Sequence, residues 1–138
     1  MPKPHVQPTD PRRARGLAAE QAAADWLERA GHSLIARNLR LGHLEVDLVS
    51  IDPRDAALVI TEVKARRAGR HAPELRVDRA KRRNLVLAAR MLLARTPFRR
   101  RAARFDVIAV TLDALGTPVD LRHMPRAFDA TPEPRQRR

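Results

Sequence analysis

Two charged side chains, Glu62 and Lys64, follow directly on an apolar run in the segment LVITEVKAR at residues 58–66. The run predicts a buried β-strand, and because side chains alternate between the two faces of a strand, Glu62 and Lys64 project from the same face. The earlier segment HLEVDLVS at residues 43–50 places Asp47 in a similar setting. If the two strands pair across the turn sequence DPRD, the carboxylates of Asp47 and Glu62 come within a few ångströms of each other.

Two carboxylates at that separation repel each other unless a positive group lies between them. A divalent cation suits this position, because Mg²⁺ is commonly held by one or two carboxylates together with the phosphate of its substrate. Asp47 and Glu62 are therefore candidate ligands of Mg²⁺ or Mn²⁺, and Lys64 is a candidate to orient a water molecule or to stabilise charge that develops on phosphorus. The alternative is a surface ladder of ion pairs between Asp47, Lys64 and Glu62, which an E-x-K pattern alone does not exclude.

Two more charged residues, Glu20 and Lys81, fall on the apolar stripes of predicted helices. The segment GLAAEQAAADWLERAG at residues 16–31 consists of strong helix formers and ends at a glycine, which favours a helix C-terminus. The apolar stripe of this helix places Trp26 in the core. Glu20 lies on or beside the same stripe, where an unpaired carboxylate is costly. Glu20 therefore needs a partner near the sheet, unless it and Lys81 lie at the edges of their helices and reach water.

Lysine is rare in this chain. Only Lys3, Lys64 and Lys81 occur among the 28 basic residues, and the other 25 are arginine. A position next to a metal ion favours a compact ammonium group, because a guanidinium is larger, planar and presents its donors in a fixed fork. The rarity of lysine therefore supports a role for Lys64 and draws attention to Lys81.

The remaining pattern predicts the elements that position these residues. The first helix begins at residue 11 or, because Arg12, Arg13 and Arg15 oppose the positive end of the helix dipole, nearer Gly16. Three strands, a second helix, another strand and a short edge strand follow, at residues 32–40, 45–51, 57–66, 77–96, 104–112 and 119–124. The expected fold class is α/β, in the order α-β-β-β-α-β. We expect one domain at residues 15–124 between disordered basic tails at residues 1–14 and 125–138.

Length and composition fit a single small domain with a polyanionic partner. The chain has 138 residues, a formal net charge of +12 and an isoelectric point near 11.7, which favour nucleic acid over an anionic membrane surface. Cysteine is absent, so disulfides, thiolate catalysis and cysteine-based zinc sites are excluded. No apolar run approaches the roughly 18 residues of a membrane span, so we expect a cytoplasmic protein without a membrane partner.

The positive charge is concentrated around the E-x-K motif. Residues 65–104 contain 14 Lys and Arg residues but only two acidic residues, Glu74 and Asp78. Such a segment binds phosphates without reading sequence, and the scarcity of aromatic residues argues against a platform that stacks bases. The alternative is a solvated, arginine-rich face. The candidate nucleic-acid contacts are Arg66, Arg67, Arg70, Arg79, Lys81, Arg82 and Arg83.

With these motifs in order, the chain resembles the YraN family of small bacterial proteins from about residue 16 to residue 110. The matching segments are GLAAEQAAADWLERAG, ARNLR, LEVDLVS, ITEVKAR, the helix around Lys81, and RFDVIAV. The resemblance implies a restriction-endonuclease-like PD-(D/E)XK fold, with a mixed sheet flanked by helices, related to archaeal Holliday-junction resolvases.

The resemblance also implies roles for individual residues. Asp47, Glu62 and Lys64 match the catalytic motif, and Glu20 matches the helix glutamate that completes the metal site. Where the family usually has glycine, this chain carries Ala19 before the helix glutamate and Leu44 before the strand motif. Neither change removes a ligand.

These observations lead to two hypotheses of different classes. The first is a metal-dependent nuclease that hydrolyses DNA phosphodiesters, with branched or flap structures as candidate substrates and Mg²⁺ or Mn²⁺ as cofactor. The second is a non-catalytic nucleic-acid-binding protein that retains the fold, because a fold does not imply an activity. In both, DNA is preferred to RNA as the partner, and a homodimer is compatible with the fold.

Overall fold

The computed structural model describes residues 11–69 and 76–130. Along the chain, these residues form α1 (Pro11–Arg29), β1 (Ser33–Leu41), β2 (Leu44–Ile51), β3 (Leu58–Arg67), α2 (Arg79–Leu93), the short 3₁₀ helix η1 (Thr96–Phe98), β4 (Ala103–Leu112) and β5 (Pro118–Phe128). The α/β class and the order of elements expected from the sequence are confirmed. The last strand is longer than expected, because β5 has 11 residues rather than a short segment at 119–124.

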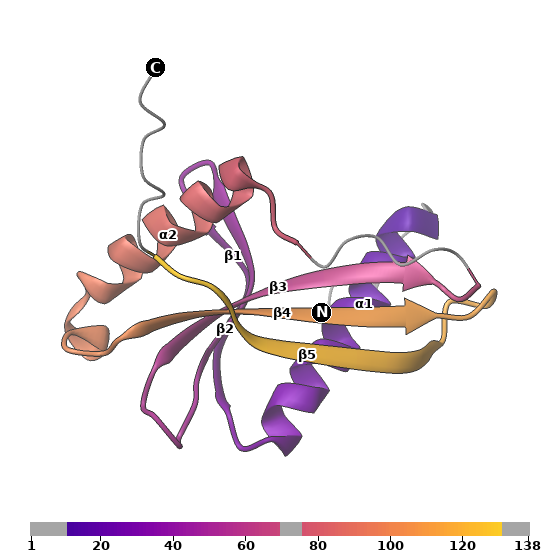
Figure 1. Cartoon of the computed structure of the whole chain (residues 1–138), viewed down its shortest axis with the longest axis horizontal. Helices are drawn as coiled ribbons and strands as arrows, with labels where there is room; N and C mark the ends of the chain where they lie inside the picture. Colours follow the sequence, from indigo (N-terminus) through magenta and orange to yellow (C-terminus); the bar gives the residue numbers. More distant parts are fainter. Residues whose placement is uncertain (1–10, 70–75, 131–138) are drawn as a thin grey trace, which may run out of the picture.

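The five strands form one mixed sheet in the order β1-β2-β3-β4-β5 (Figure 1). β3 and β4 run parallel, and the other neighbours run antiparallel. A parallel pair needs a crossover connection, which α2 provides between β3 and β4. No helix in the described ranges has the length and hydropathy needed to cross a membrane.

The two helices pack on opposite faces of the sheet, as alternate residues of β4 show. Phe105 and Val107 belong to the apolar cluster that includes Leu85 of α2. Ile108 belongs to a second cluster that includes Leu27 of α1. Because Val107 and Ile108 are consecutive in a strand, their side chains point to opposite faces. β4 is therefore covered on both sides, which explains its apolar run at residues 107–110.

α1 begins at Pro11 rather than near Gly16. Proline fits the first turn of a helix, because its missing N–H would have no partner there. The first turn contains no acidic residue to offset its arginines. Packing of Ala19, Ala23 and Leu27 against the sheet stabilises the helix instead, since all three are buried.

Two further expectations from the sequence need correction. Residues 11–14 belong to α1 and residues 125–128 to β5, so the ordered unit extends beyond residues 15–124. The tails at residues 1–10 and 131–138 lie outside the described residues. Trp26 is 41% exposed rather than in the core, because the buried side of α1 passes through Ala24 and Leu27 instead.

The sheet divides between β2 and β3. Their ladder is short: it runs from the pair Ile51–Leu58 to the pair Leu48–Thr61. Beyond that last pair, β2 continues against β1 whereas β3 continues against β4. Figure 1 shows β1 and β2 running steeply across the direction of β3 and β4. The residues immediately beyond the division are Asp47 on β2 and Glu62 on β3.

Candidate active site

Asp47 lies at the division of the sheet and bonds across it. Its Oδ2 accepts a hydrogen bond from the backbone N–H of Val63 at 2.8 Å. This N–H belongs to β3 two residues beyond Thr61, the last residue paired with β2. If the ladder between β2 and β3 continued, a backbone carbonyl of β2 would accept this hydrogen bond. The carboxylate of Asp47 accepts it instead, which holds Asp47 close to Glu62.

Glu62 lies against Lys81 of α2. Its side chain is 16% exposed, and its Oε2 lies 3.6 Å from the Nζ of Lys81, which forms an ion pair. The same Oε2 is buried and accepts no hydrogen bond. A buried carboxylate oxygen without a donor is costly, so this atom is suited to a positively charged ligand.

The pKa values of both carboxyl groups are raised. Burial, followed by the negative charge of Asp47, raises the pKa of Glu62 to about 7 against the opposing charges of Lys81 and Lys64. Burial also raises the pKa of Asp47, although the hydrogen bond from Val63 and the charge of Lys81 oppose the rise. The pair therefore takes up protons more readily than ordinary carboxylates, which is typical of a site prepared for a positive ligand.

Glu20 reaches the same region from α1. Burial raises the pKa of Glu20, a hydrogen bond with the Asn38 side chain opposes the rise, and the charges of Asp47 and Glu45 add to it. Asn38 has a positive φ of 48° within β1, a conformation that asparagine tolerates better than most residues. Glu20 therefore has the partner near the sheet that its place on the helix required, in the motif ARNLR.

Lys64 joins the end of β3 to the start of α2. Its Nζ donates a hydrogen bond to the backbone carbonyl of Arg76 at 2.6 Å. Its charge also acts on Glu62, as does that of Lys81. Both lysines in the described part of this arginine-rich chain are thus at the same carboxylate, whereas Lys3 lies outside the described residues.

The carboxylates of this site fit a hard divalent cation that keeps water or phosphate oxygens among its ligands. Within residues 11–69 and 76–130, no three Asp, Glu or His side chains come together closely enough to enclose a metal ion. Asp47 and Glu62 are a pair, and the charge of Asp47 acts on Glu20. Mg²⁺ commonly binds through one or two carboxylates and completes its shell with water and phosphate oxygens. The unpartnered Oε2 of Glu62 agrees with that mode of binding.

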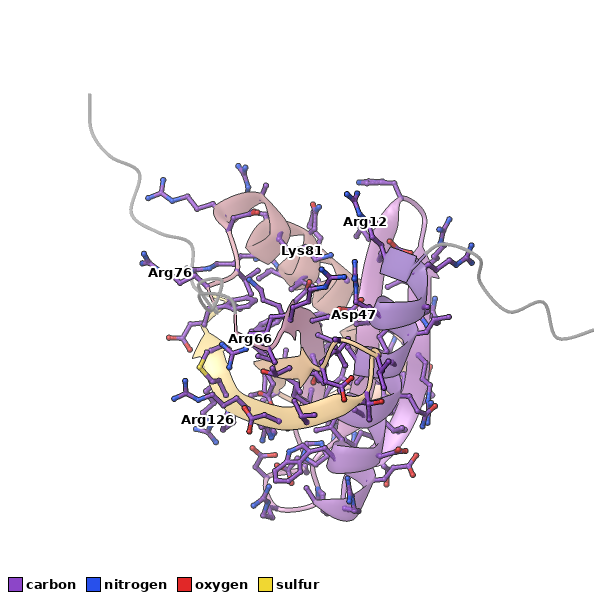
Figure 2. All side chains as sticks on the ribbon, turned by 90° about the vertical axis from the view of Figure 1, so that its right-hand side faces the viewer. Arg12, Asp47, Arg66, Arg76, Lys81 and Arg126 are labelled. Atoms are coloured by element: carbon purple, nitrogen blue, oxygen red, sulfur yellow. The ribbon has the colours of Figure 1, made fainter. Side chains whose placement is uncertain are left out.

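Basic side chains lie in the same view as Asp47 at the carboxyl-terminal end of β3. In Figure 2, Arg12 of α1 and Lys81 of α2 both lie above Asp47, and Arg66 of β3 lies to its lower left. Three of the predicted nucleic-acid contacts are exposed: Arg67, Arg79 and Arg83. Arg70 lies outside the described residues.

Besides Lys81, which pairs with Glu62, two arginines among the predicted nucleic-acid contacts bond inside the fold. Arg66 donates from Nε to the Oγ1 of Thr111 at 2.8 Å. Arg82 donates from Nε to the carbonyl of Val77 at 2.7 Å, and its guanidinium lies 5.5 Å from the centre of the Phe128 ring. Arg82 therefore helps to hold the start of α2, so its replacement would disturb the fold as well as the charge.

A second polar cluster, centred on Arg104, is not evident from the sequence pattern. The guanidinium is 10% exposed and contacts Asp52 and Asp55 at 2.8 Å and Asp106 at 2.9 Å. Burial would raise the pKa of Asp52, but hydrogen bonds from Arg104 and Arg54 outweigh it, and the pKa lies below its ordinary range. These contacts tie the turn between β2 and β3 to the beginning of β4.

Asp106, to which the sequence assigns no role, is fully buried within this cluster. Its Oδ2 accepts a hydrogen bond from the Nε2 of His123 at 2.8 Å, and its Oδ1 accepts one from the backbone N–H of Arg126 at 3.1 Å. Trp26 donates to the Nδ1 of His123 at 3.1 Å, which places the proton of a neutral His123 on Nε2. The cluster links α1, β4 and β5, and its role is structural. The spacing of Arg104 and Asp106, two apart on one strand face, is the signal that could have indicated it.

Comparison with known proteins places the whole arrangement in one family. A family model described as "Uncharacterised protein family UPF0102" matches residues 19–110, which include both candidate ligands. A UPF0102 protein of Nitratidesulfovibrio vulgaris is 41% identical over 123 residues, covering 88% of this chain and 89% of the relative. UPF0102 proteins of Trichlorobacter lovleyi and Symbiobacterium thermophilum are 37% and 43% identical, over 84% and 69% of this chain and 91% and 80% of their own lengths. The resemblance to the YraN group is confirmed, and the chain belongs to the UPF0102 family.

Proposed function

We propose that this protein is a metal-dependent hydrolase of DNA phosphodiesters, with Asp47 and Glu62 as its metal ligands. The observation that carries the proposal is the pair itself. Two partly buried carboxyl groups at the division of the sheet have raised pKa values, and one of their buried oxygens accepts no hydrogen bond. Such a pair costs stability in the absence of a cation, so its position in the fold favours a functional role.

A bound Mg²⁺ or Mn²⁺ would supply Lewis-acid polarisation of a phosphate oxygen. Asp47 is oriented for this role by the N–H of Val63. Lys64 and Lys81 bring two ammonium groups to the carboxylates, where they would stabilise the negative charge that grows on the phosphate during reaction. Water attacks phosphorus in line and gives up a proton to solvent, the bond from phosphorus to the leaving sugar oxygen breaks, and that oxygen takes a proton from solvent. Glu20 is the outer carboxylate of the site.

The starts of both helices support a polyanionic substrate. Neither α1 nor α2 has an acidic residue in its first turn, and α2 opens with the sequence RAKRR, against which Asp78 at the N-cap is the one acidic residue. Basic side chains there oppose the positive end of the helix dipole and cost stability, which an anion bound nearby would offset. Lys81 on α2 lies 3.6 Å from Glu62, and its charge also acts on Asp47. A phosphate backbone that passes the carboxylates would therefore contact the start of α2.

Cleavage of a DNA panel tests this function. The panel contains linear, nicked, flap and four-way DNA, with Mn²⁺ present. We expect the wild type to cleave at least one branched substrate, and we expect Glu62→Gln and Asp47→Asn to lose about 100-fold or more in rate. Glu28→Gln is the matched control, because Glu28 is an exposed glutamate that pairs with Arg37 at 3.7 Å. Equal cleavage by the wild type and Glu62→Gln would indicate a contaminating nuclease and would overturn the proposal.

A second function, DNA binding without catalysis, is favoured by one specific observation. Lys81 already neutralises Glu62, so the carboxylate has a counter-charge without metal. In this case the carboxylates hold β3 to α2, and DNA binding is strong, salt-dependent and the same in Mg²⁺ and in EDTA. Tight binding without cleavage of any substrate, and without metal uptake by the wild type, would favour this second function.

A further inference from the structure

The ammonium groups of Lys64 and Lys81 both act on Glu62 through their charge, but they have different nearest partners. The Nζ of Lys81 lies 3.6 Å from Oε2 of Glu62. The Nζ of Lys64, although it is on the same strand face as Glu62, is bonded to the carbonyl of Arg76 at 2.6 Å. Lys81 is therefore the ammonium that directly faces the candidate metal ligand.

The backbone of Lys81 is fixed by the start of α2. Its N–H donates to Oδ1 of Asp78 at 2.8 Å, which caps the helix. Val77, which precedes Asp78, is buried in the core, and Arg82 donates a hydrogen bond to its carbonyl. The Lys81 side chain thus extends from an anchored turn and can change direction without movement of α2. Its side chain is 34% exposed, so it has access to solvent on one side.

An ammonium and a divalent cation compete for the same buried carboxylate oxygen of Glu62. The two positive charges repel each other, and Oε2 of Glu62 is too deeply buried to accommodate both. Asp47 is affected in the same way, because the charge of Lys81 acts on it too. Removal of the Lys81 ammonium would make the electrostatic potential at Asp47 and Glu62 more negative, so a metal ion would bind there more tightly.

We propose that Lys81 takes the place of the divalent cation beside Glu62 in the metal-free protein, and that metal binding displaces its ammonium toward the phosphate of bound DNA. This inference rests on the proposed function. It assigns Lys81 two successive partners: the carboxylate before the metal binds, and a phosphate oxygen afterwards. The site is then neutralised in the absence of metal, which reduces the cost of burying two carboxylates. A cation is also ready for the charge that develops on the phosphate.

Calorimetric titration of DNA-free protein with Mg²⁺ tests the displacement without any measurement of cleavage. The titration is run at about pH 9, above the pKa of about 7 that Glu62 has in the wild type. Lys81→Ala and Lys81→Gln should bind Mg²⁺ about tenfold more tightly than the wild type, because one repelling charge is gone. Lys64→Ala should change the affinity less, since the Lys64 ammonium is bonded to the Arg76 carbonyl. Arg83→Ala is the control for loss of an exposed charge on the same helix.

The outcomes separate this inference from the function on which it rests. If the wild type binds Mg²⁺ but Lys81→Ala binds it no more tightly than Lys64→Ala does, the displacement is wrong while the metal site stands. Weaker Mg²⁺ binding by both Lys81 variants, with normal thermal unfolding, would also overturn the displacement. It would mean that Lys81 helps the site to bind metal. If the wild type binds no Mg²⁺, with or without DNA, the proposed function and this inference fail together.

Discussion

The backbone N–H of Val63 donates to the carboxylate of Asp47 at 2.8 Å, across the place where β2 and β3 separate. Because the ladder between these strands ends at Leu48 and Thr61, this bond is the next interaction along the division. A candidate metal ligand is thus also a connection between two halves of the sheet. This arrangement explains why Asp47 remains fixed although burial and the nearby carboxylates disfavour its charge.

Glu62→Gln should change the way in which stability depends on pH. The pKa of Glu62 is about 7 in the folded protein against an ordinary 4.5, so the protonated carboxyl group favours folding. This contribution is complete below the unfolded pKa and is lost as the pH rises through the folded pKa. Glutamine resembles the protonated form at every pH. The free energy of unfolding of the variant should therefore exceed that of the wild type by up to about 3 kcal/mol near pH 8, and by much less near pH 5. Urea unfolding at both pH values measures the difference, and an equal difference at both would contradict the assigned pKa.

Arg104→Met should destabilise the fold strongly. It removes the partner of Asp52 and Asp106, both buried carboxylates, and leaves their charges uncompensated. Loss of one partner of a buried ion pair typically costs about 3–5 kcal/mol. Arg54→Met is the matched control, because Arg54 contacts the same Asp52 at 3.3 Å but its side chain is 73% exposed, so we expect a cost below about 1 kcal/mol. A free energy of unfolding reduced equally by both changes would contradict the structural role of Arg104.

Much of the fold could be predicted from the sequence because its signals are local. Alternating apolar residues and the turn DPRD predict the β1–β2–β3 meander, and helix formers followed by Gly31 predict the end of α1. The errors arise where tertiary packing decides. Proline and the packing of alanines outweigh three unfavourable arginines at the start of α1. Trp26 turns outward because it bonds to His123, which lies 97 residues further along the chain.

The candidate site could be predicted in part. Hairpin pairing brings Asp47 toward Glu62, and the rarity of lysine indicates both Lys64 and Lys81. The sequence could not show where the ladder between β2 and β3 ends. Nor could it show that Lys81 rather than Lys64 is the closer ion-pair partner of Glu62, because that depends on the packing of α2. It also gave no role to Asp106, since Arg104 is the one partner near it in the chain and the other two, His123 and Arg126, come from β5.

Removal of the exposed charges at the start of α2 should reduce the salt dependence of DNA binding. Each phosphate contact contributes about −0.9 to the slope of log affinity against log salt, so Arg79→Ala with Arg83→Ala should flatten the slope by about one to two units. Arg82 is left intact, because it holds Val77 and Phe128. The control is Arg95→Ala with Arg99→Ala, an equal loss of exposed charge roughly 20 Å away beyond the other end of the helix. Titration of duplex DNA in EDTA at several salt concentrations gives the slopes. Equal slopes for the two double variants would place the nucleic-acid interface elsewhere.

Paramagnetic broadening by Mn²⁺ tests the central claim, that Asp47 and Glu62 form a metal site, most directly. A substoichiometric amount of Mn²⁺ is added to ¹⁵N-labelled protein, and the loss of backbone amide signals is mapped on the structure. We expect the amides of Asp47, Glu62 and Val63 to broaden first. Asp47→Asn should abolish the effect, whereas Asp25→Asn, a change of an exposed aspartate on α1, should not. Broadening centred on the turn at Asp52 and Asp55, or broadening that persists unchanged in Asp47→Asn, would contradict it.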